Sequence, residues 1–465
     1  MAEITKQISS IKLAPLKEIK DLNASGDEPV RFRGFLDSSS GMKTTTFMVV
    51  RDCLETVQCI HTLPSDATEE VAALFKEHKK MSIETYLEVT GKIKRVSSAI
   101  KKCTKKDFEI EVTRIEVLGK VYGKLPFLKK DVTDMSSSTV GYNVRLDNRT
   151  LDFRMPATHA MVRVIDQTMF SFRRILRERD FIEIKTSKII QSGSEGGANM
   201  FSVDYFDKKA YLAQSPQLYK QLCVLGGMKR VYEVGHVYRA EVSNINRYLS
   251  EFTGLDIEME LETDFIGFIK FVHSVFVGIF ESLKSDTAAE LEIIRKYSPF
   301  DDVAYKNEPV VLTHSECVKM LREAGEEVGE KDDFSRKQEK TLGGLVKQKH
   351  GVDLFVCVGY PVEVRAFYTY AEEDGTTRSY DFILNGEEVL SGAQRQTDYE
   401  KLKVAIQKKG ISLSSLDSYL EPFKYGAPPH IGCGIGLERL LKAFFSQCDI
   451  RHFSLFPRDP NRLTP

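Results

Sequence analysis

The sequence lacks the cysteine and histidine patterns that mark zinc-dependent folds and disulfide-stapled secreted domains. Its eight cysteines are scattered and none belongs to a Cys-x-x-Cys pair, so neither a zinc site nor a disulfide framework is predicted. The nine histidines show no His-Glu-x-x-His spacing. Unpaired thiols of this kind are typical of a reducing compartment.

The chain also has no excess of one charge and no apolar run of membrane length. With 66 basic and 67 acidic residues the net charge is −1, so only a local basic face could attract nucleic acid. The lysine-rich residues 92–106 are either such a face or a solvated one. The most apolar stretch, residues 265–280, contains Lys270 and His273 and is shorter than the ~20 residues of a membrane span. We expect a buried helix there, no membrane partner, and, because the N-terminus has no apolar signal core, a cytoplasmic protein.

Length and composition favour a soluble protein of more than one domain. The 465 residues are 42% hydrophobic and 29% charged, and a chain of this length exceeds one compact core. Pattern changes along it predict a lead-in at 1–28, a first domain at 29–119, a linker or hinge at 120–145 and a second domain at 146–465.

The first domain is predicted to be a small β-barrel. Five short segments alternate apolar and polar residues, as half-buried strands do. A helical segment at 67–78 follows the third of them. This order of elements is that expected of the OB-fold. The strand segments are 30–36, 46–51, 56–60, 86–93 and 108–112.

The second domain is predicted to be α+β. Helical spacing at 158–179, 216–225 and 264–284 is interspersed with strand segments, and no regular βαβ repeat is present. A last helix begins near Gly436. The expected strands are 181–184, 232–238, 255–259, 355–358 and 379–384.

Two arginines in this domain follow ordered segments instead of lying in charged runs. Arg239 ends an apolar strand, where it could grip a phosphate or pair with Glu241 or Glu258. Arg439 follows Gly-Cys-Gly-Ile-Gly at 432–436, which lacks the G-x-G-x-x-G spacing of a dinucleotide site. Alone, that run could be a capping turn with a surface arginine.

A third segment, residues 379–395, places acids among apolar residues. Asp381 and Glu388 lie near strand ends, among apolar residues. Mg²⁺ prefers one or two carboxylates together with phosphate oxygens. The alternative is that both are surface acids. Arg395 closes the segment.

Together these segments resemble motifs 2 and 3 of the class II aminoacyl-tRNA synthetases, most nearly aspartyl-tRNA synthetases of the eukaryotic and archaeal type. The resemblance covers residues 28–465 and implies ATP and Mg²⁺ as substrate and cofactor. It implies catalytic roles for Arg239, Glu241 and Arg439, and a metal site at Asp381 and Glu388. It implies that the ATP-binding residues are Arg239, Arg247, Tyr248, Phe252, Glu388, Ser391, Gly436 and Arg439.

The same resemblance implies an aspartate pocket and a nucleic-acid partner. Arg395 and Lys220 would hold the side-chain carboxylate, Gln217 and Asp256 the ammonium group, and 194–198 would form a closing loop. The implied aspartate-binding set is Ser194, Glu195, Gln217, Lys220, Asp256, Ser391 and Arg395. In the barrel, Phe47, Gln58 and Glu109 would read the anticodon of tRNA(Asp), unless Phe47 is core and Glu109 solvated. A homodimer is implied as well.

Three positions depart from the family pattern. Tyr248 stands where a histidine usually contacts the γ-phosphate, and a tyrosine carries no positive charge near neutral pH. Arg247 could supply that charge instead. Ser187 replaces the proline of motif 1, and Cys433 replaces a glycine.

Other functions stay open beside aspartate–tRNA ligation. They are an asparaginyl-tRNA synthetase, an enzyme that does not discriminate aspartate from asparagine, a non-catalytic tRNA-binding paralogue, and an amino-acid-activating enzyme without tRNA. Lys220 and the segment 386–395 argue against an asparaginyl-tRNA synthetase. The retained arginines and acids argue against a non-catalytic paralogue. The barrel argues against an enzyme that works without tRNA.

Overall fold

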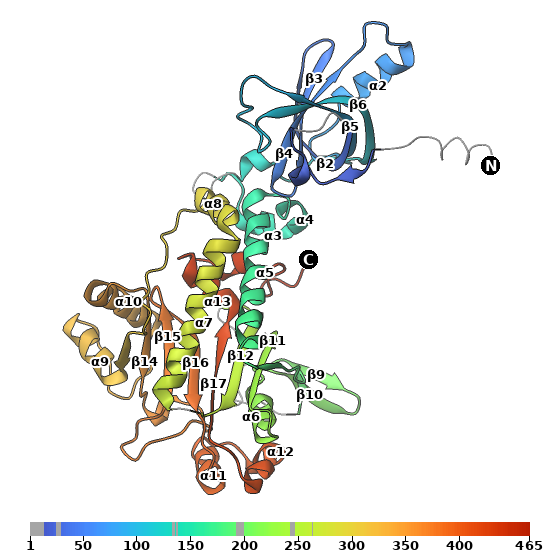
Figure 1. Cartoon of the computed structure of the whole chain (residues 1–465). Helices are drawn as coiled ribbons and strands as arrows, with labels where there is room; N and C mark the ends of the chain where they lie inside the picture. Colours follow the sequence, from blue (N-terminus) through green and yellow to red (C-terminus); the bar gives the residue numbers. More distant parts are fainter. Residues whose placement is uncertain are drawn as a thin grey trace. The chain divides into compact units, whose positions relative to one another are not determined.

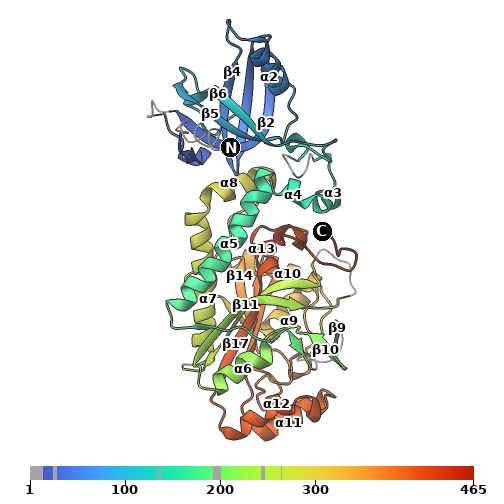
Figure 2. The same ribbon diagram turned by 90° about the vertical axis from the view of Figure 1, so that its right-hand side faces the viewer.

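The computed structural model describes residues 14–24, 29–132, 135, 138–191, 200–241, 247–262 and 264–465. The chain divides into two compact units, Met1–Asp131 with Phe153–His159, and Val132–Asp152 with Ala160–Pro465. Figures 1 and 2 show the elements of both from two directions. Short 3-10 turns lie at Ile19–Asp21, Lys129–Asp131, Val362–Val364, Leu413–Ser415, Glu421–Tyr425 and Ile450–Phe453.

The first unit is a closed barrel, which confirms the predicted OB-type fold. Its strands are ordered β1-β2-β3-β4-β6-β5, and β2 also pairs with β5 to close the sheet. Inward-facing side chains such as Phe32, Val50 and Cys59 are fully buried and form its core. The elements are β1 (Leu16–Lys17), β2 (Val30–Gly41), β3 (Thr45–Asp52), β4 (Glu55–Thr62), α2 (Glu69–Lys79), β5 (Tyr86–Arg95) and β6 (Phe108–Gly119).

The second unit is built on an eight-stranded sheet of order β13-β14-β15-β16-β17-β12-β11-β7. All its neighbours are antiparallel except β13–β14 and β11–β7. The strands are β7 (Ile182–Glu183), β11 (Arg230–Tyr238), β12 (Glu251–Glu260), β13 (Val311–Thr313), β14 (Leu354–Val358), β15 (Ser379–Leu384), β16 (Glu387–Gln394) and β17 (His430–Gly436). A separate small sheet contains β8 (Ile189–Ile190), β9 (Ser202–Tyr205) and β10 (Lys208–Leu212).

Two long helices, α5 (Pro156–Arg177) and α7 (Phe265–Asp286), run side by side over one face of this sheet (Figures 1 and 2). Their apolar side chains share one core with the strands, as in the stacking of Phe276 on Phe382. Helix α7 is long and apolar enough to cross a membrane, but more than half of its most apolar 18 residues are buried inside the protein. The predicted core helix is therefore confirmed.

The shorter helices pack around the sheet and the long helices, and α13 (Leu437–Phe444) lies against the central strands β12, β15, β16 and β17 (Figure 1). Helices α9 and α10 pack beside β13–β16. The remaining elements are α3 (Tyr142–Asp147), α4 (Arg149–Asp152), α6 (Gln217–Leu225), α8 (Ala288–Tyr297), α9 (His314–Glu323), α10 (Arg336–His350), α11 (Tyr399–Lys408), α12 (Asp417–Leu420) and α13 (Leu437–Phe444).

Strand register brings distant polar residues into one row across the sheet. Asp256 on β12 is opposite Glu233 on β11 and Gly434 on β17. Gly434 is opposite Ser391 on β16, which is in turn opposite Asp381 on β15. Directly opposed residues point to the same face of an antiparallel sheet, so this row places all the polar side chains on one side.

Candidate active site

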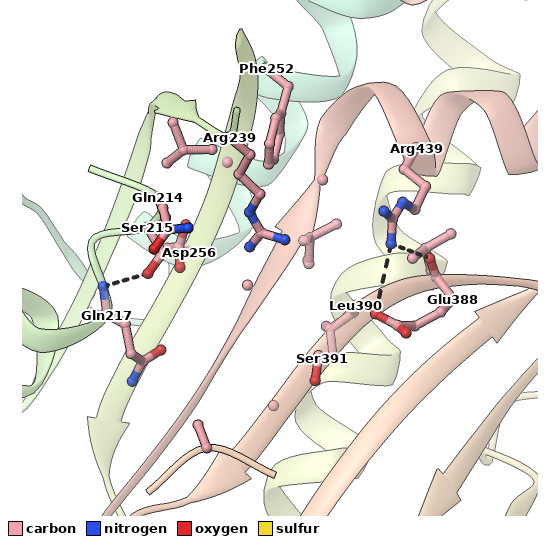
Figure 3. Close-up of a pocket in the computed structure, with 18 of the residues that line it drawn as sticks. Gln214, Ser215, Gln217, Arg239, Phe252, Asp256, Glu388, Leu390, Ser391 and Arg439 are labelled. Atoms are coloured by element: carbon pink, nitrogen blue, oxygen red, sulfur yellow. Dashed lines mark hydrogen bonds and ion pairs between the residues drawn. The ribbon is translucent and has the colours of Figure 1, made fainter. Parts of the chain in front are cut away.

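A pocket of about 470 Å³ lies over this row in the second unit. Residues from β12, β16 and β17 line it, together with the segments that follow β11 and begin α13. Figure 3 shows acidic and basic side chains converging on it from separate elements. Such a concave site with a few convergent charged groups is the usual form of a small-molecule binding site.

Arg239 enters the pocket from the end of β11. Its backbone N–H donates to the carbonyl of Ser250 at 2.9 Å, which fixes the start of its side chain. The guanidinium carbon lies 5.6 Å from the ring centroid of Phe252 on β12, and Figure 3 shows both side chains at the pocket. Glu241 also lines the pocket. The expected alternative partner, Glu258, is bonded to Arg395 instead.

Arg439 approaches from the opposite end, on the first turn of α13. One of its terminal nitrogens donates to the Glu388 carbonyl at 3.3 Å and lies 3.8 Å from the Glu388 carboxylate (Figure 3). The ring of Tyr248 lies 5.9 Å from its guanidinium carbon. Gly436 caps α13 and lines the same end of the pocket. The helix thus begins where the sequence predicts.

Arg247, which is predicted to bind ATP, forms an ion pair within the protein. Its guanidinium donates to both carboxylate oxygens of Glu339 on α10, at 3.1 and 2.8 Å, and both side chains are buried. Glu339 also accepts from the backbone N–H of Glu388 at 3.1 Å. The charge of Arg247 is therefore already paired, and binding of ATP by this residue stays a prediction.

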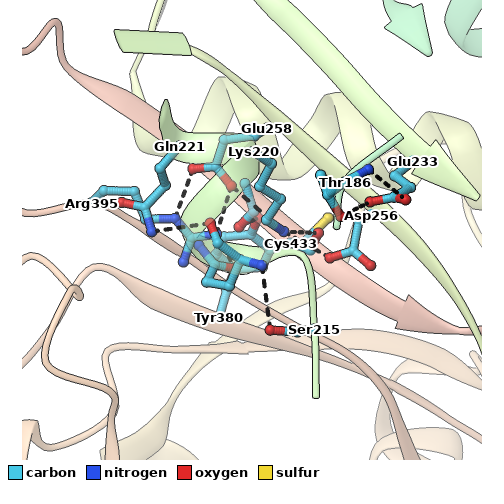
Figure 4. Close-up of polar contacts among 12 residues, drawn as sticks. Thr186, Ser215, Lys220, Gln221, Glu233, Asp256, Glu258, Tyr380, Arg395 and Cys433 are labelled. Carbon is cyan, nitrogen blue, oxygen red and sulfur yellow. Dashed lines mark hydrogen bonds and ion pairs between the residues drawn. The ribbon is translucent and has the colours of Figure 1, made fainter. Parts of the chain in front are cut away.

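A buried network of two bases and two acids occupies the other side of the pocket (Figure 4). Arg395 donates to the two carboxylate oxygens of Glu258 at 2.8 and 2.9 Å and to the amide oxygen of Gln217 at 3.3 Å. Lys220 on α6 donates to Asp256 at 2.9 Å and to the Cys433 carbonyl at 2.8 Å. Four full charges thus lie together with almost no exposure to water.

The pKa directions within this network follow from burial and pairing. Burial raises the pKa of Glu258, but the charges of Arg395 and Lys220 outweigh that effect, so the pKa lies below its ordinary value. Burial also raises the pKa of Asp256, and there Lys220 offsets it incompletely. Glu258 therefore stays ionised as the fixed partner of Arg395.

Not every predicted aspartate ligand reaches the pocket. Gln217, Asp256, Ser391 and Arg395 line it. Lys220 is 1% exposed and is absent from the lining, so its direct contact with a substrate stays a prediction. Ser194 and Glu195 lie outside the described residues.

The two acids predicted to hold a metal occupy different positions. Glu388 lines the pocket with its side chain 31% exposed, and burial, aided by the charge of Asp381, raises its pKa to about 7. Asp381 is 2% exposed and paired with Arg365. Among the described residues no group of three or more His, Cys, Asp or Glu is placed to hold a metal. The donor set still fits Mg²⁺ bound with a nucleotide, which needs only one or two carboxylates.

Several residues that shape the site were not assigned to it from the sequence. Glu258 lies two residues after Asp256 on β12, so the strand period alone places both on the pocket face. Gly432 has no room for a side chain because an added Cβ would lie 2.0 Å from the Glu258 carboxylate. Glu438 accepts from the Thr253 N–H at 3.0 Å and so ties α13 to β12 beside Phe252.

At the motif 1 departure, polar contacts hold the chain on both sides of Ser187. Ser187 is exposed, and the chain on either side of it is anchored by Glu233 on β11. The Glu233 carboxylate accepts from the Thr186 hydroxyl at 2.6 Å and pairs with Lys188 at 3.1 Å (Figure 4). Cys433 is fully buried on β17, with its carbonyl bonded to Lys220.

In the barrel unit, the structure brings the three predicted anticodon residues to one outward face. Phe47 on β3 is opposite Ile60 on β4, which lies two residues from Gln58 and so on the same face of that strand. Phe47 is not among the residues of the barrel core. Gln58 donates to the Glu109 carboxylate at 2.9 Å. Glu109 is 8% exposed, so it is not a freely solvated acid. Their contact with RNA stays a prediction.

Comparison with known proteins places the fold and site in a family. The family described as tRNA synthetases class II (D, K and N) matches residues 141–460. The chain belongs to this family.

Within it, the chain is similar to aspartate–tRNA ligases along its whole length. It is 53% identical to a "Probable aspartate--tRNA ligase, cytoplasmic" of Enterocytozoon bieneusi (strain H348), covering 100% of this chain and 99% of that one. It is 37% identical to the human "Aspartate--tRNA ligase, cytoplasmic", covering 97% and 91%.

Solved structures of synthetases have the same fold as this chain. A putative aspartyl-tRNA synthetase from Leishmania major Friedlin superimposes with a TM-score of 0.91 at 30% identity, covering 100% of both chains. An asparaginyl-tRNA synthetase from Pyrococcus horikoshii, complexed with asparaginyl-adenylate, gives a TM-score of 0.81 at 27% identity, covering 94% and 96%.

Proposed function

We propose that the chain is a cytoplasmic aspartate–tRNA ligase that activates L-aspartate with ATP and transfers it to tRNA(Asp). The observation that carries the proposal is the buried network around Arg395 beside the two pocket arginines. Arg395 lines the pocket with its guanidinium held by Glu258, which suits the capture of a second carboxylate. Its full-length relatives named as cytoplasmic aspartate–tRNA ligases support the same substrate and location.

The first step joins the amino acid to the nucleotide. An oxygen of the α-carboxylate of aspartate attacks the α-phosphorus of ATP in line. The bond from that phosphorus to the oxygen of the β-phosphate breaks, and aspartyl-adenylate and pyrophosphate form. Arg239 stabilises charge at the α-phosphate and Phe252 stacks on adenine. Arg439 holds the γ-phosphate. Positioning and charge neutralisation supply the rate enhancement, and no side-chain nucleophile takes part.

Mg²⁺ fits the acidic end of the pocket, where it would neutralise the phosphates and help to orient them. Glu388 would hold it directly, and Ser391 and Asp381 adjoin that position through the strand register. Gln217 and Asp256 would bind the ammonium group of aspartate. Glu241 faces the reacting centre and the acceptor end of the tRNA.

The second step transfers the amino acid to RNA. The terminal adenosine hydroxyl of the tRNA attacks the carbonyl carbon of the adenylate, the bond to the AMP phosphate oxygen breaks, and the departing AMP phosphate takes up the hydroxyl proton. Phe47, Gln58 and Glu109 would bind the anticodon on the barrel, through stacking and hydrogen bonds to base edges.

We infer a homodimer from the edge of the second unit. Phe170 on α5 is 56% exposed and Ile182 on the edge strand β7 is 54% exposed. Exposed apolar side chains and an edge strand are both features that a partner surface covers.

The direct test of the activity is ATP–pyrophosphate exchange with purified protein. Aspartate should support exchange and asparagine should support little, because asparagine offers no second carboxylate to Arg395. Faster exchange with asparagine would favour the asparaginyl-tRNA synthetase alternative. No exchange with either amino acid would favour a non-catalytic paralogue.

A further inference from the structure

A basic residue outside the recognised motifs stands at the acidic end of the pocket. Arg365 lies between β14 and β15, directly after a short 3-10 turn. Its guanidinium donates to the two carboxylate oxygens of Asp381 at 2.5 and 3.3 Å and to the Ser391 hydroxyl at 3.2 Å. The side chain is 11% exposed and lines the pocket.

The guanidinium is fixed by an aromatic platform. Its central carbon lies 3.7 Å from the ring centroid of Tyr360, which is 1% exposed. Tyr360 in turn packs against His314 and Phe334. Stacking of arginine on a buried ring holds its charge in one place, so Arg365 has a preset position.

Two acids at this end of the pocket each lie beside an arginine. Asp381 is bound to Arg365, and Glu388 lies beside Arg439. A third acid, Asp333, lines the same pocket and interacts with the charge of Arg365. Without Arg365, the acids at this end of the pocket would lose one compensating positive charge, and the negative potential that attracts a free divalent cation would rise.

We propose that Arg365 is a positioning residue that makes divalent-metal binding depend on ATP. By neutralising Asp381 and orienting Ser391, it leaves Glu388 as the carboxylate open to the pocket. Mg²⁺ then gains enough oxygen ligands only when the phosphates of ATP arrive with it. This inference rests on the proposed use of Mg²⁺ and ATP at this site.

The test measures metal binding, not turnover. Free Mn²⁺ is followed by electron paramagnetic resonance during titration of the full-length protein, with and without ATP. Wild type should bind Mn²⁺ weakly alone and more tightly with ATP. Arg365→Met should bind Mn²⁺ alone about tenfold more tightly than wild type, because one unit of nearby positive charge is gone. Arg365→Lys, which keeps the charge, should stay near wild type.

Two controls separate this role from a structural one. Arg378→Met removes an arginine of the same connecting segment that pairs with Glu372 away from the pocket, and it should leave Mn²⁺ affinity unchanged. The double variant Arg365→Met with Asp381→Asn should return Mn²⁺ binding to the weak wild-type level. Should methionine prevent folding, Arg365→Gln carries the same expectations.

The outcomes are distinct. Equal Mn²⁺ affinity of folded Arg365→Met and wild type without ATP would overturn the inference alone, as would tight binding that persists in the double variant. Wild-type protein that binds no Mn²⁺ even with ATP would overturn the proposed metal site and this inference with it. Aspartate-dependent exchange would still stand or fall by its own assay.

Discussion

Substrate choice depends, at the scale of single residues, on how Arg395 is held. Its guanidinium is bonded to Glu258, which is itself fully buried, so the pocket presents a fixed cation and not a mobile one. An amide in place of the substrate carboxylate would lose a charge-assisted bond worth about 1.5–3 kcal/mol. A polar pocket of this type discriminates strongly without an editing site.

Arg395→Gln should therefore lower kcat/KM for aspartate by at least about tenfold, the lower end of that energy, while lowering asparagine activation less. Steady-state exchange kinetics with both amino acids measures the two changes. Arg378→Gln, a change at a half-buried arginine paired with Glu372, should change neither. Equal losses for aspartate and asparagine would contradict the assignment of Arg395.

A second residue-scale prediction concerns the γ-phosphate end. Tyr248 packs near Arg439 without adding a positive charge, and Arg247 is already paired with Glu339. Tyr248→His should tighten ATP binding, seen as a lower KM for ATP in the exchange assay. An unchanged KM would show that position 248 does not contact the nucleotide.

Residue pairing across long sequence distances is what the sequence could not predict. Arg395 and Glu258 are 137 positions apart, and Arg247 and Glu339 are 92 apart. Periodicity reports which face of an element is buried, but not which distant charge lies opposite. Arg365 was missed although its partner Asp381 is only 16 positions away, because it lies in an irregular connecting segment whose contacts are defined only by the fold.

At the scale of elements, some strongly periodic segments were predicted well and others were not. The helix expected at 264–284 is α7 (Phe265–Asp286), and the strand expected at 379–384 is β15. Helices α8 to α11 and the small β8–β10 sheet gave no recognised signal. Strand β6 extends seven residues beyond its predicted end at 112, to Gly119, through a register shift that breaks the alternation.

The outward face of the barrel carries an element-scale prediction. Phe47→Ala should weaken binding of tRNA(Asp) about tenfold or more, because stacking of one base on an aromatic ring is worth about 1–3 kcal/mol. Filter binding with transcribed tRNA measures it, and exchange without tRNA should be unaffected. Val71→Ala on the exposed side of α2 serves as control. Undiminished tRNA affinity of Phe47→Ala would place the anticodon elsewhere.

At the scale of the whole molecule, the exposed apolar side chains of Phe170 and Ile182 lead to a prediction about assembly. Sedimentation equilibrium should give twice the chain mass of 52.8 kDa. Phe170→Glu with Ile182→Lys should shift it toward one chain mass by placing charges in a buried interface. Tyr425→Glu, an exposed aromatic far along the chain, should not. A monomeric wild type would contradict the dimer.

The measurement that tests the central account most directly is amino-acid-dependent ATP–pyrophosphate exchange by the wild-type protein. The wild-type protein should give robust exchange with L-aspartate and at least about tenfold less efficient exchange with L-asparagine, since one charge-assisted bond to Arg395 is lost. Exchange that is equal with the two amino acids, or faster with asparagine, would contradict it.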